Sequence, residues 1–184
     1  MWRFRCGLLH RSRSDDMAVR NIVTYPNQIL KTPCQVVEQI DDWVRQLVDD
    51  LVDTMHAGPG SVGVASPQIG VSLRVCVIDV SKNRHGKDNN HGLLLMINPE
   101  ILARSGAAVM REGCMSVPDY TGDVERSTEL TLRFTEPDGT VREFEASGFE
   151  AVAIQHELDH LDGLLFLDRI ASLKTGLFRR KSYK

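Results

Sequence analysis

The sequence lacks the features that mark several common classes of protein. It has no apolar run of about 18 residues, the length that a transmembrane helix needs, so we expect no membrane span. Its four cysteines show no paired spacing, which fits a reducing compartment. The excess of negative charge is small, because the chain has 22 Lys and Arg and 25 Asp and Glu, for a net charge of −3. This balance gives no electrostatic reason to expect binding to nucleic acid or a membrane surface.

Residues 1–16 have a different composition from the rest of the chain. Four arginines precede the first acids, Asp15 and Asp16, and Met17 opens a more ordinary segment. Three origins fit this pattern: an upstream mis-assigned start or expression remnant, a genuine bacterial extension, or an organellar transit peptide, which is typically Arg-rich and acid-poor. We therefore divide the chain into a basic N-terminal extension, residues 1–16, and a single folded domain, residues 17–184, which is long enough to bury one core.

The most informative motif is Gln155-His156-Glu157-Leu158-Asp159-His160. Two histidines four residues apart lie on one face of a helix and can bind one metal ion, while Glu157 would reach a water on that ion. Apolar residues around the motif, from Phe149 to Leu161, predict a helix buried on most sides. Because buried polar groups are costly without partners, this cluster needs a metal or a polar network. The alternative is a pair of core or surface histidines that happen to be one turn apart.

The sequence also lacks a third metal ligand downstream of this motif. The position of the third histidine in the metzincin pattern is Phe166, and no Asp or Glu follows Asp168. A third ligand must therefore lie upstream, and Cys114 is the best candidate among the cysteines. It lies in Glu112-Gly113-Cys114-Met115-Ser116, where glycine permits close backbone approach and a metal would hold the sulfur as thiolate. For Cys114 alone, a small buried hydrophobic residue remains the alternative.

Three blocks, in order, resemble the peptide deformylase family. They are Ser-Val-Gly-Val-Ala-Ser-Pro-Gln at residues 61–68, Glu-Gly-Cys-Met-Ser at 112–116 and Gln-His-Glu-Leu-Asp-His-Leu-Asp-Gly at 155–163. The second and third blocks together are specific, since a cysteine upstream of the two histidines marks this family. Ser61 and Ser66 stand where the family usually has glycine and alanine. Both are small, so we expect a subtle change in the loop and no loss of chemistry.

The expected fold is α+β, with antiparallel strands packed around a central metal-binding HExxH helix, similar to peptide deformylase. Apolar residues at helical spacing predict a helix at residues 44–55, ended by Gly58-Pro59-Gly60. Alternating patterns and turn residues predict strands and one hairpin before the metal helix, at residues 73–80, 93–97, 130–134 and 141–146. The basic segment 171–184 is expected to form a terminal helix.

The resemblance implies a metal-dependent hydrolase that removes the formyl group from N-formyl-methionyl nascent polypeptides and releases formate. The metal ligands that it implies are Cys114, His156 and His160. The catalytic groups that it implies are Glu157, which would carry the proton, with the Gln68 side chain and the Met115 backbone N–H, which would bind the oxyanion. Fe²⁺ is the implied native ion, and a site with two His and one Cys also accepts Zn²⁺, Ni²⁺ or Co²⁺.

The resemblance also implies how the peptide is bound. The methionine side chain would enter an apolar pocket formed by Val62, Val152 and Ala153, with Phe149 nearby. Gly63 and Gly113 would offer backbone hydrogen bonds to the peptide. Ordinary core packing is the alternative for Val152 and Phe149. An ion pair between Glu112 and Arg126 is expected to brace the cysteine loop, and a surface role is the alternative for Arg126.

Other function classes share some of these features. An HExxH metallopeptidase usually takes its third ligand from downstream, and a broad amidase would accept acyl groups other than formyl. A binding module with a structural metal would normally supply four protein ligands, and only three are evident. The expected partners are the formyl-methionyl peptide and, transiently, the ribosome, with no specific nucleic acid and no membrane. The expected location is the bacterial cytoplasm, or an organelle if residues 1–16 are a transit peptide.

Overall fold

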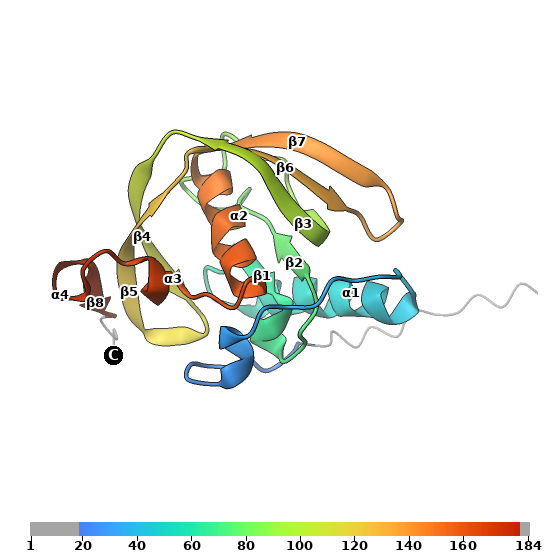
Figure 1. Ribbon diagram of the computed structural model, residues 1–184, viewed down its shortest axis with the longest axis horizontal. Coiled ribbons are helices and arrows are strands. Elements are labelled where there is room, and N and C mark those ends of the chain that lie inside the picture. The colour runs from blue at the N-terminus through green and yellow to red at the C-terminus, as the bar shows by residue number, and fades with distance from the viewer. Residues whose placement is uncertain (1–18, 181–184) are drawn as a thin grey trace, which may run out of the picture.

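The computed structural model describes residues 19–180, and its strands form two antiparallel sheets (Figure 1). The basic extension predicted at residues 1–16 lies outside the described residues. The larger sheet has the order β1 (Gly63–Ala65), β2 (Val75–Ile78), β3 (Leu94–Ser105), β6 (Glu129–Thr135) and β7 (Val141–Ser147). The smaller sheet has the order β4 (Ala108–Cys114), β5 (Val117–Arg126) and β8 (Leu177–Arg179).

Helices cover these sheets. Within residues 19–180 the α-helices are α1 (Asp42–Ala57), α2 (Gly148–Leu161), α3 (Phe166–Arg169) and α4 (Leu173–Gly176), and the short 3₁₀ helices are η1 (Gln28–Lys31) and η2 (Ser66–Ile69). The start of α1 is fixed by Asp41, whose carboxylate accepts the Val44 N–H at 2.9 Å. In the part of the chain that the structure describes, no helix is both long and apolar enough to cross a bilayer.

Helix α2 contacts both sheets and carries the two histidines of the HExxH motif (Figure 1). Its apolar residues, including Ala151, Ile154 and Leu158, join the core formed with β2, β3, β6 and β7. Its polar residues include Glu157 and His160, which are buried as well. A helix that is buried on nearly all sides can hold charged groups only if neighbouring elements supply partners for them.

Strands β1 and β4 are edge strands. In the described residues β1 pairs only with β2, and β4 pairs only with β5, so each keeps one row of backbone N–H and C=O groups outside its sheet. Gly63 of β1 and Gly113 of β4 line the same cavity. Two unpaired strand edges therefore border one site.

The predicted α+β class is confirmed, as are the helix at α1 and the β6–β7 hairpin. Strand β3 extends beyond residue 97, where the sequence predicted its end. Asn98 adopts a positive φ of 52° and the register with β6 shifts before Glu100, and this irregularity accommodates Pro99 within the strand. The β4–β5 hairpin was not predicted. The predicted helix over residues 171–184 is wrong at Leu177–Arg179, because these residues form β8 and pair with β5.

Candidate metal centre

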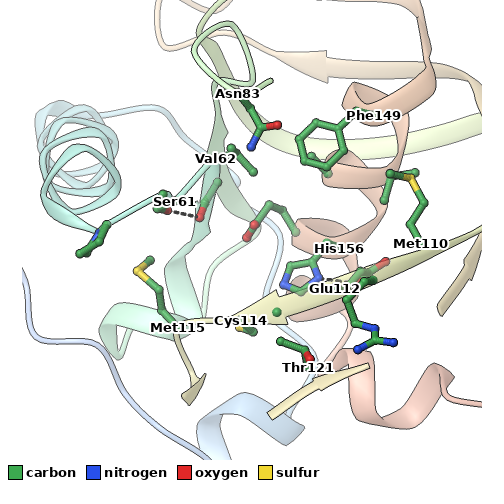
Figure 2. A pocket seen from close by; sticks show the side chains of 18 of the residues that line it. Ser61, Val62, Asn83, Met110, Glu112, Cys114, Met115, Thr121, Phe149 and His156 are labelled. Atoms are coloured by element: carbon green, nitrogen blue, oxygen red, sulfur yellow. Dashed lines mark hydrogen bonds and ion pairs between the residues drawn. The ribbon is translucent and has the colours of Figure 1, made fainter. Parts of the chain in front are cut away.

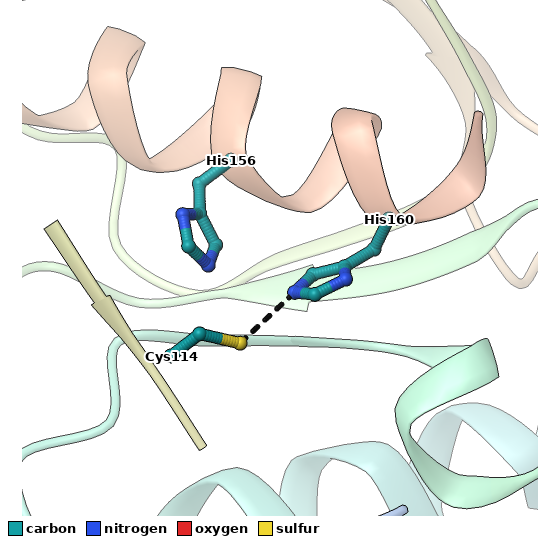
Figure 3. A group of neighbouring side chains, drawn as sticks. All are labelled: Cys114, His156 and His160. Atoms are coloured by element: carbon teal, nitrogen blue, oxygen red, sulfur yellow. Dashed lines mark hydrogen bonds between the residues drawn. The ribbon is translucent and has the colours of Figure 1, made fainter. Parts of the chain in front are cut away.

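Cys114, His156 and His160 come together although 46 residues separate the cysteine from His160. Cys114 ends β4, and the two histidines project from successive turns of α2 toward it (Figure 3). Cys114 Sγ lies 3.2 Å from His160 Nε2, and the ligand atoms of all three residues lie within 4.8 Å of one another. Bonds of about 2.0–2.3 Å to one tetrahedral ion place ligand atoms roughly 3.3–3.8 Å apart. The three residues therefore fit one ion with little movement.

Glu112 fixes the ring of His156. Its Oε2 lies 2.8 Å from His156 Nδ1, so the Nε2 atom of that ring is left for a metal (Figure 2). Burial opposes the ionisation of Glu112, but hydrogen bonds from His156 and Arg126 outweigh it and lower its pKa to about 2. The carboxylate stays charged, and a charged partner makes the imidazole a better ligand.

Arg126 connects Glu112 to Asp159 in a buried ion-pair network. Its guanidinium donates to Glu112 Oε1 at 2.7 Å and to Asp159 Oδ2 at 2.6 Å, and Arg169 donates to Asp159 Oδ1 at 2.7 Å. The predicted pair between Glu112 and Arg126 is therefore confirmed. The network joins β4, β5, α2 and α3 around the histidines, so the position of His156 depends on all four elements.

The thiol of Cys114 favours its ionised form. Burial opposes ionisation, but the charge of His160 and hydrogen bonds from His156 and His160 hold the pKa of Cys114 well below its usual value. For His156 burial lowers the pKa, and the hydrogen bonds with Cys114 and Glu112 outweigh that effect and raise it well above normal. Metal binding requires the thiolate form of Cys114 and the neutral form of His156, so the lowered pKa of Cys114 favours binding and the raised pKa of His156 opposes it.

Glu157 is buried beside the three ligands with an exposure of 4%. A Cβ atom on Gly63 would lie 2.5 Å from Glu157 Oε1, so only glycine fits at that position of β1. The other carboxylate oxygen, Oε2, is buried and has no hydrogen-bond partner among the described residues. Burial is the main cause that raises the pKa of Glu157 to about 7, against the opposing effect of the two histidines. A carboxyl group with this pKa can both take and return a proton near neutrality.

Gln68 holds its side-chain amide against the sulfur of Cys114. The Ala65 N–H donates to Gln68 Oε1 at 2.9 Å, which orients the amide so that Nε2 donates to Ser116 Oγ at 3.2 Å and to Cys114 Sγ at 3.4 Å. Both Gln68 and Ser116 are buried. The turn of η2 thus aims a fixed N–H donor at the metal centre.

A cavity of about 330 Å³ opens onto these groups (Figure 2). Its size lies within the usual range for small-molecule sites. Every site residue predicted from the sequence lines it except His160, which is fully buried behind it. The lining residues that were predicted are Val62, Gly63, Gln68, Gly113, Cys114, Met115, Phe149, Val152, Ala153, His156 and Glu157.

The cavity is also lined by residues that were not predicted as site residues, among them Asn83, Met110, Arg111, Thr121 and Arg180. Asn83 lies in the segment between β2 and β3, and Arg180 belongs to the segment that was expected to be a terminal helix. No local pattern in the sequence signals either position. The role of Asp159 was missed as well, although an acid on an otherwise apolar helix predicts a buried partner.

Comparison with known proteins agrees with this geometry. A family model described as polypeptide deformylase matches residues 19–176. The peptide deformylase of Syntrophobacter fumaroxidans is 42% identical over 165 residues, which cover 90% of this chain and 94% of that protein. The solved peptide deformylase of Ehrlichia chaffeensis in complex with actinonin has a TM-score of 0.79 at 35% identity and covers 86% of this chain and 92% of that one. A class I type b peptide deformylase from Acinetobacter baumannii, solved with Met-Ala-Ser bound, has a TM-score of 0.78 at 35% identity. The match covers 84% of this chain and 99% of that one.

Proposed function

The chain belongs to the polypeptide deformylase family, and on that premise we propose that Cys114, His156 and His160 hold one divalent ion while Glu157 carries the proton. Its activity is the metal-dependent removal of the formyl group from N-formyl-methionyl nascent peptides. The observation that supports these roles best is the convergence of three ligand atoms within 4.8 Å beside a buried, unpaired carboxylate oxygen.

The bound ion and Glu157 would have different roles in the hydrolysis. When bound, a divalent ion lowers the pKa of a coordinated water and polarises the formyl carbonyl. Glu157 accepts a proton from the attacking water as the new C–O bond forms at the formyl carbon. The same carboxyl group then returns the proton to the nitrogen as the C–N bond breaks. The products are formate and a peptide with a free N-terminal methionine.

Gln68 and Met115 are proposed to stabilise the negative charge that develops on the formyl oxygen. The contact from Gln68 Nε2 to Cys114 Sγ, at 3.4 Å, is long and goes to a weak acceptor. One N–H of the amide can therefore turn from the sulfur to a substrate oxygen, while the bond from Ala65 to Oε1 keeps the side chain oriented. The Met115 backbone N–H would be the second donor, next to Cys114 in the chain.

The peptide is proposed to lie between the edges of β1 and β4. Gly63 and Gly113 would offer backbone groups to an extended peptide, as in other cases where a strand is added to a sheet edge. The methionine side chain would enter the apolar part of the cavity, formed by Val62, Val152 and Ala153 with Phe149 nearby. The Acinetobacter baumannii enzyme was solved with Met-Ala-Ser bound, which supports a peptide as the ligand of this chain.

We propose Fe²⁺ as the native ion, with Zn²⁺, Ni²⁺ or Co²⁺ as substitutes. The two imidazoles and one thiolate suit all four metals, so the choice of iron depends on the family resemblance. Loss of activity in air with Fe²⁺, but not with Ni²⁺ or Zn²⁺, is the expected result, because iron promotes oxidation of the neighbouring thiolate. We also propose that the enzyme works in the cytoplasm and meets its substrates transiently at the ribosome, which co-sedimentation with translating ribosomes would test.

The decisive experiment measures formate release from formyl-Met-Ala-Ser by protein of known metal content. We expect activity in proportion to bound metal, loss of activity with a chelator, and recovery when the metal is added back. Cys114→Ser should lose most of its metal, because two remaining ligands cannot hold the ion tightly. Cys34→Ala serves as the control, since Cys34 is buried outside the cavity. Full metal retention in Cys114→Ser would contradict the proposed ligand set, and casein cleavage without formate release would indicate a peptidase.

A further inference from the structure

Arg180 is a cavity residue that neither the proposed mechanism nor the pocket for methionine uses. It directly follows β8, and its guanidinium lies over the backbone of Gly113, next to the proposed ligand Cys114. A Cβ atom placed on Gly113 would overlap Arg180 Nη2 and lie 3.5 Å from Arg180 Cζ. Glycine at position 113 therefore makes room for this side chain as well as for a peptide.

The smaller sheet fixes the position of Arg180. Gly113 pairs with Thr121, and Thr121 pairs with Phe178, so these three residues form one row across β4, β5 and β8. Arg180 is two residues after Phe178 and so lies on the same face of the strand. Its backbone N–H donates to Asp119 O at 2.7 Å, which continues the pairing with β5. The guanidinium of Arg111 packs over the Phe178 ring at 3.5 Å and holds β8 in place.

Arg180 is the cavity arginine whose charge is available to a ligand. Arg111, which also lines the cavity, pairs with Asp123 at 2.6 Å. The Arg180 guanidinium makes no hydrogen bond or ion pair within residues 19–180. A guanidinium has five N–H donors in a planar fork that matches a carboxylate.

We infer that Arg180 binds a carboxylate of the peptide substrate beyond its formyl-methionine and thereby makes the enzyme prefer acidic peptides. The inference rests on the proposed function, because the peptide must lie along Gly113 with its formyl group at Cys114. An Asp or Glu side chain and a free C-terminal carboxylate share the required chemistry. Arg180 would contact the peptide away from the reacting atoms and act on specificity. Replacing it should therefore raise KM for acidic peptides and leave kcat unchanged.

The test compares acidic and neutral peptides of equal length. Formyl-Met-Ala-Ser-Ala-amide is varied with Glu or Gln at the second, third or fourth residue, and the parent peptide is also used as a free acid. We expect wild type to favour Glu over Gln at one position by roughly twofold to tenfold in kcat/KM, the usual range for a partly exposed charged hydrogen bond. The preference should come from KM and weaken at high salt. Preference for the free acid alone would identify the terminal carboxylate as the group bound.

Variants separate the charge of Arg180 from any structural effect. Arg180→Gln should cleave Glu and Gln peptides equally well, and Arg180→Lys should keep part of the preference. Arg179→Gln is the matched control, since Arg179 is the preceding residue, is exposed at the end of β8 and does not line the cavity. The inference fails if wild type shows no preference for any carboxylate peptide. It also fails if Arg179→Gln removes the preference, or if Arg180→Gln slows all peptides equally. Failure of the proposed function is a different result, namely no formate release from the neutral peptide.

Discussion

At the scale of single residues, the carboxyl group of Glu157 is the part of the site that acts most directly on the proton. We expect Glu157→Gln to keep the fold and the bound metal while losing about 10² to 10⁴ in kcat, since only the proton carrier is removed. Formate release by metal-loaded protein measures this loss. Metal analysis and circular dichroism of the same sample are the controls. Near-normal turnover would show that another group moves the proton.

The pH dependence of the reaction follows from the same residue. Burial raises the pKa of Glu157 to about 7, and the carboxyl must be ionised before it can accept a proton. The active enzyme also holds a cation beside Glu157, so about 7 is an upper bound for the pH below which kcat/KM falls. A cation bound beside Glu157 lowers its pKa, so the acidic limb shifts to lower pH and never to higher pH. Rates between pH 5 and 9 measure the limb, and a flat profile would contradict the assignment.

Site residues that lie close together in the sequence were easier to predict than those that lie far apart. His156, Glu157 and His160 lie within one and a half turns of a helix, so their spacing alone predicted that they share a site. Cys114 could be linked to them only by eliminating other ligands and by resemblance to a family. Arg180 could not be predicted from the sequence, because its place in the cavity depends on the pairing of β8 with β5.

At the scale of elements, Arg126 joins β4, β5, α2 and α3 through two buried carboxylates. Replacing it, as in Arg126→Leu, leaves Glu112 and Asp159 without their shared cation. We expect the free energy of unfolding to fall by about 3–5 kcal/mol, the usual cost of breaking a buried pair. Metal affinity should fall too, because Glu112 orients His156. Urea denaturation and metal titration measure the two effects.

The surface pair between Arg133 and Glu100 provides the control for this prediction. Their side chains are 47% and 62% exposed, so Arg133→Leu should change stability by less than about 1 kcal/mol. Equal losses in Arg126→Leu and Arg133→Leu would mean that the network around the histidines has no special role.

Elements with local signals were predicted best. The β6–β7 hairpin surrounds a Pro-Asp-Gly turn and was found, whereas β4 and β5 were missed. Polar and charged residues such as Arg111, Glu112 and Asp123 interrupt these strands, and so the apolar alternation that predicts a strand is weak. Strand β8 exists through its pairing with β5, which no local propensity encodes.

At the scale of the whole molecule, the cavity lies where the two sheets meet α2, and its apolar wall should set the choice of substrate. Val152→Ala widens the proposed methionine pocket, and we expect a loss in kcat/KM of about 1 to 3 kcal/mol for formyl-Met peptides, mainly through KM. Metal content should not change. Val141→Ala is the control, since Val141 is 62% exposed on β7.

The part of the cavity that would bind the formyl group should discriminate between substrates more strongly than the methionine pocket does. Gln68 and the backbone of Cys114 and Met115 would crowd the carbonyl, leaving room for a hydrogen atom but little for a methyl group. We expect acetyl-Met-Ala-Ser to react far more slowly than formyl-Met-Ala-Ser in a comparison of kcat/KM. Similar rates for both peptides would indicate a broad amidase instead.

The unpaired edges of β1 and β4 have a consequence for the synthesis of this protein. A chain leaves the ribosome from its N-terminus, so both edge strands appear well before α2, which supplies two of the three proposed ligands. During that interval α1 can pack against β1 and β2, but the contacts that α2 makes with β1 and β4 are missing, and exposed edges are templates for aggregation. Premature termination between β5 and α2 would therefore produce an inactive fragment that is prone to aggregate.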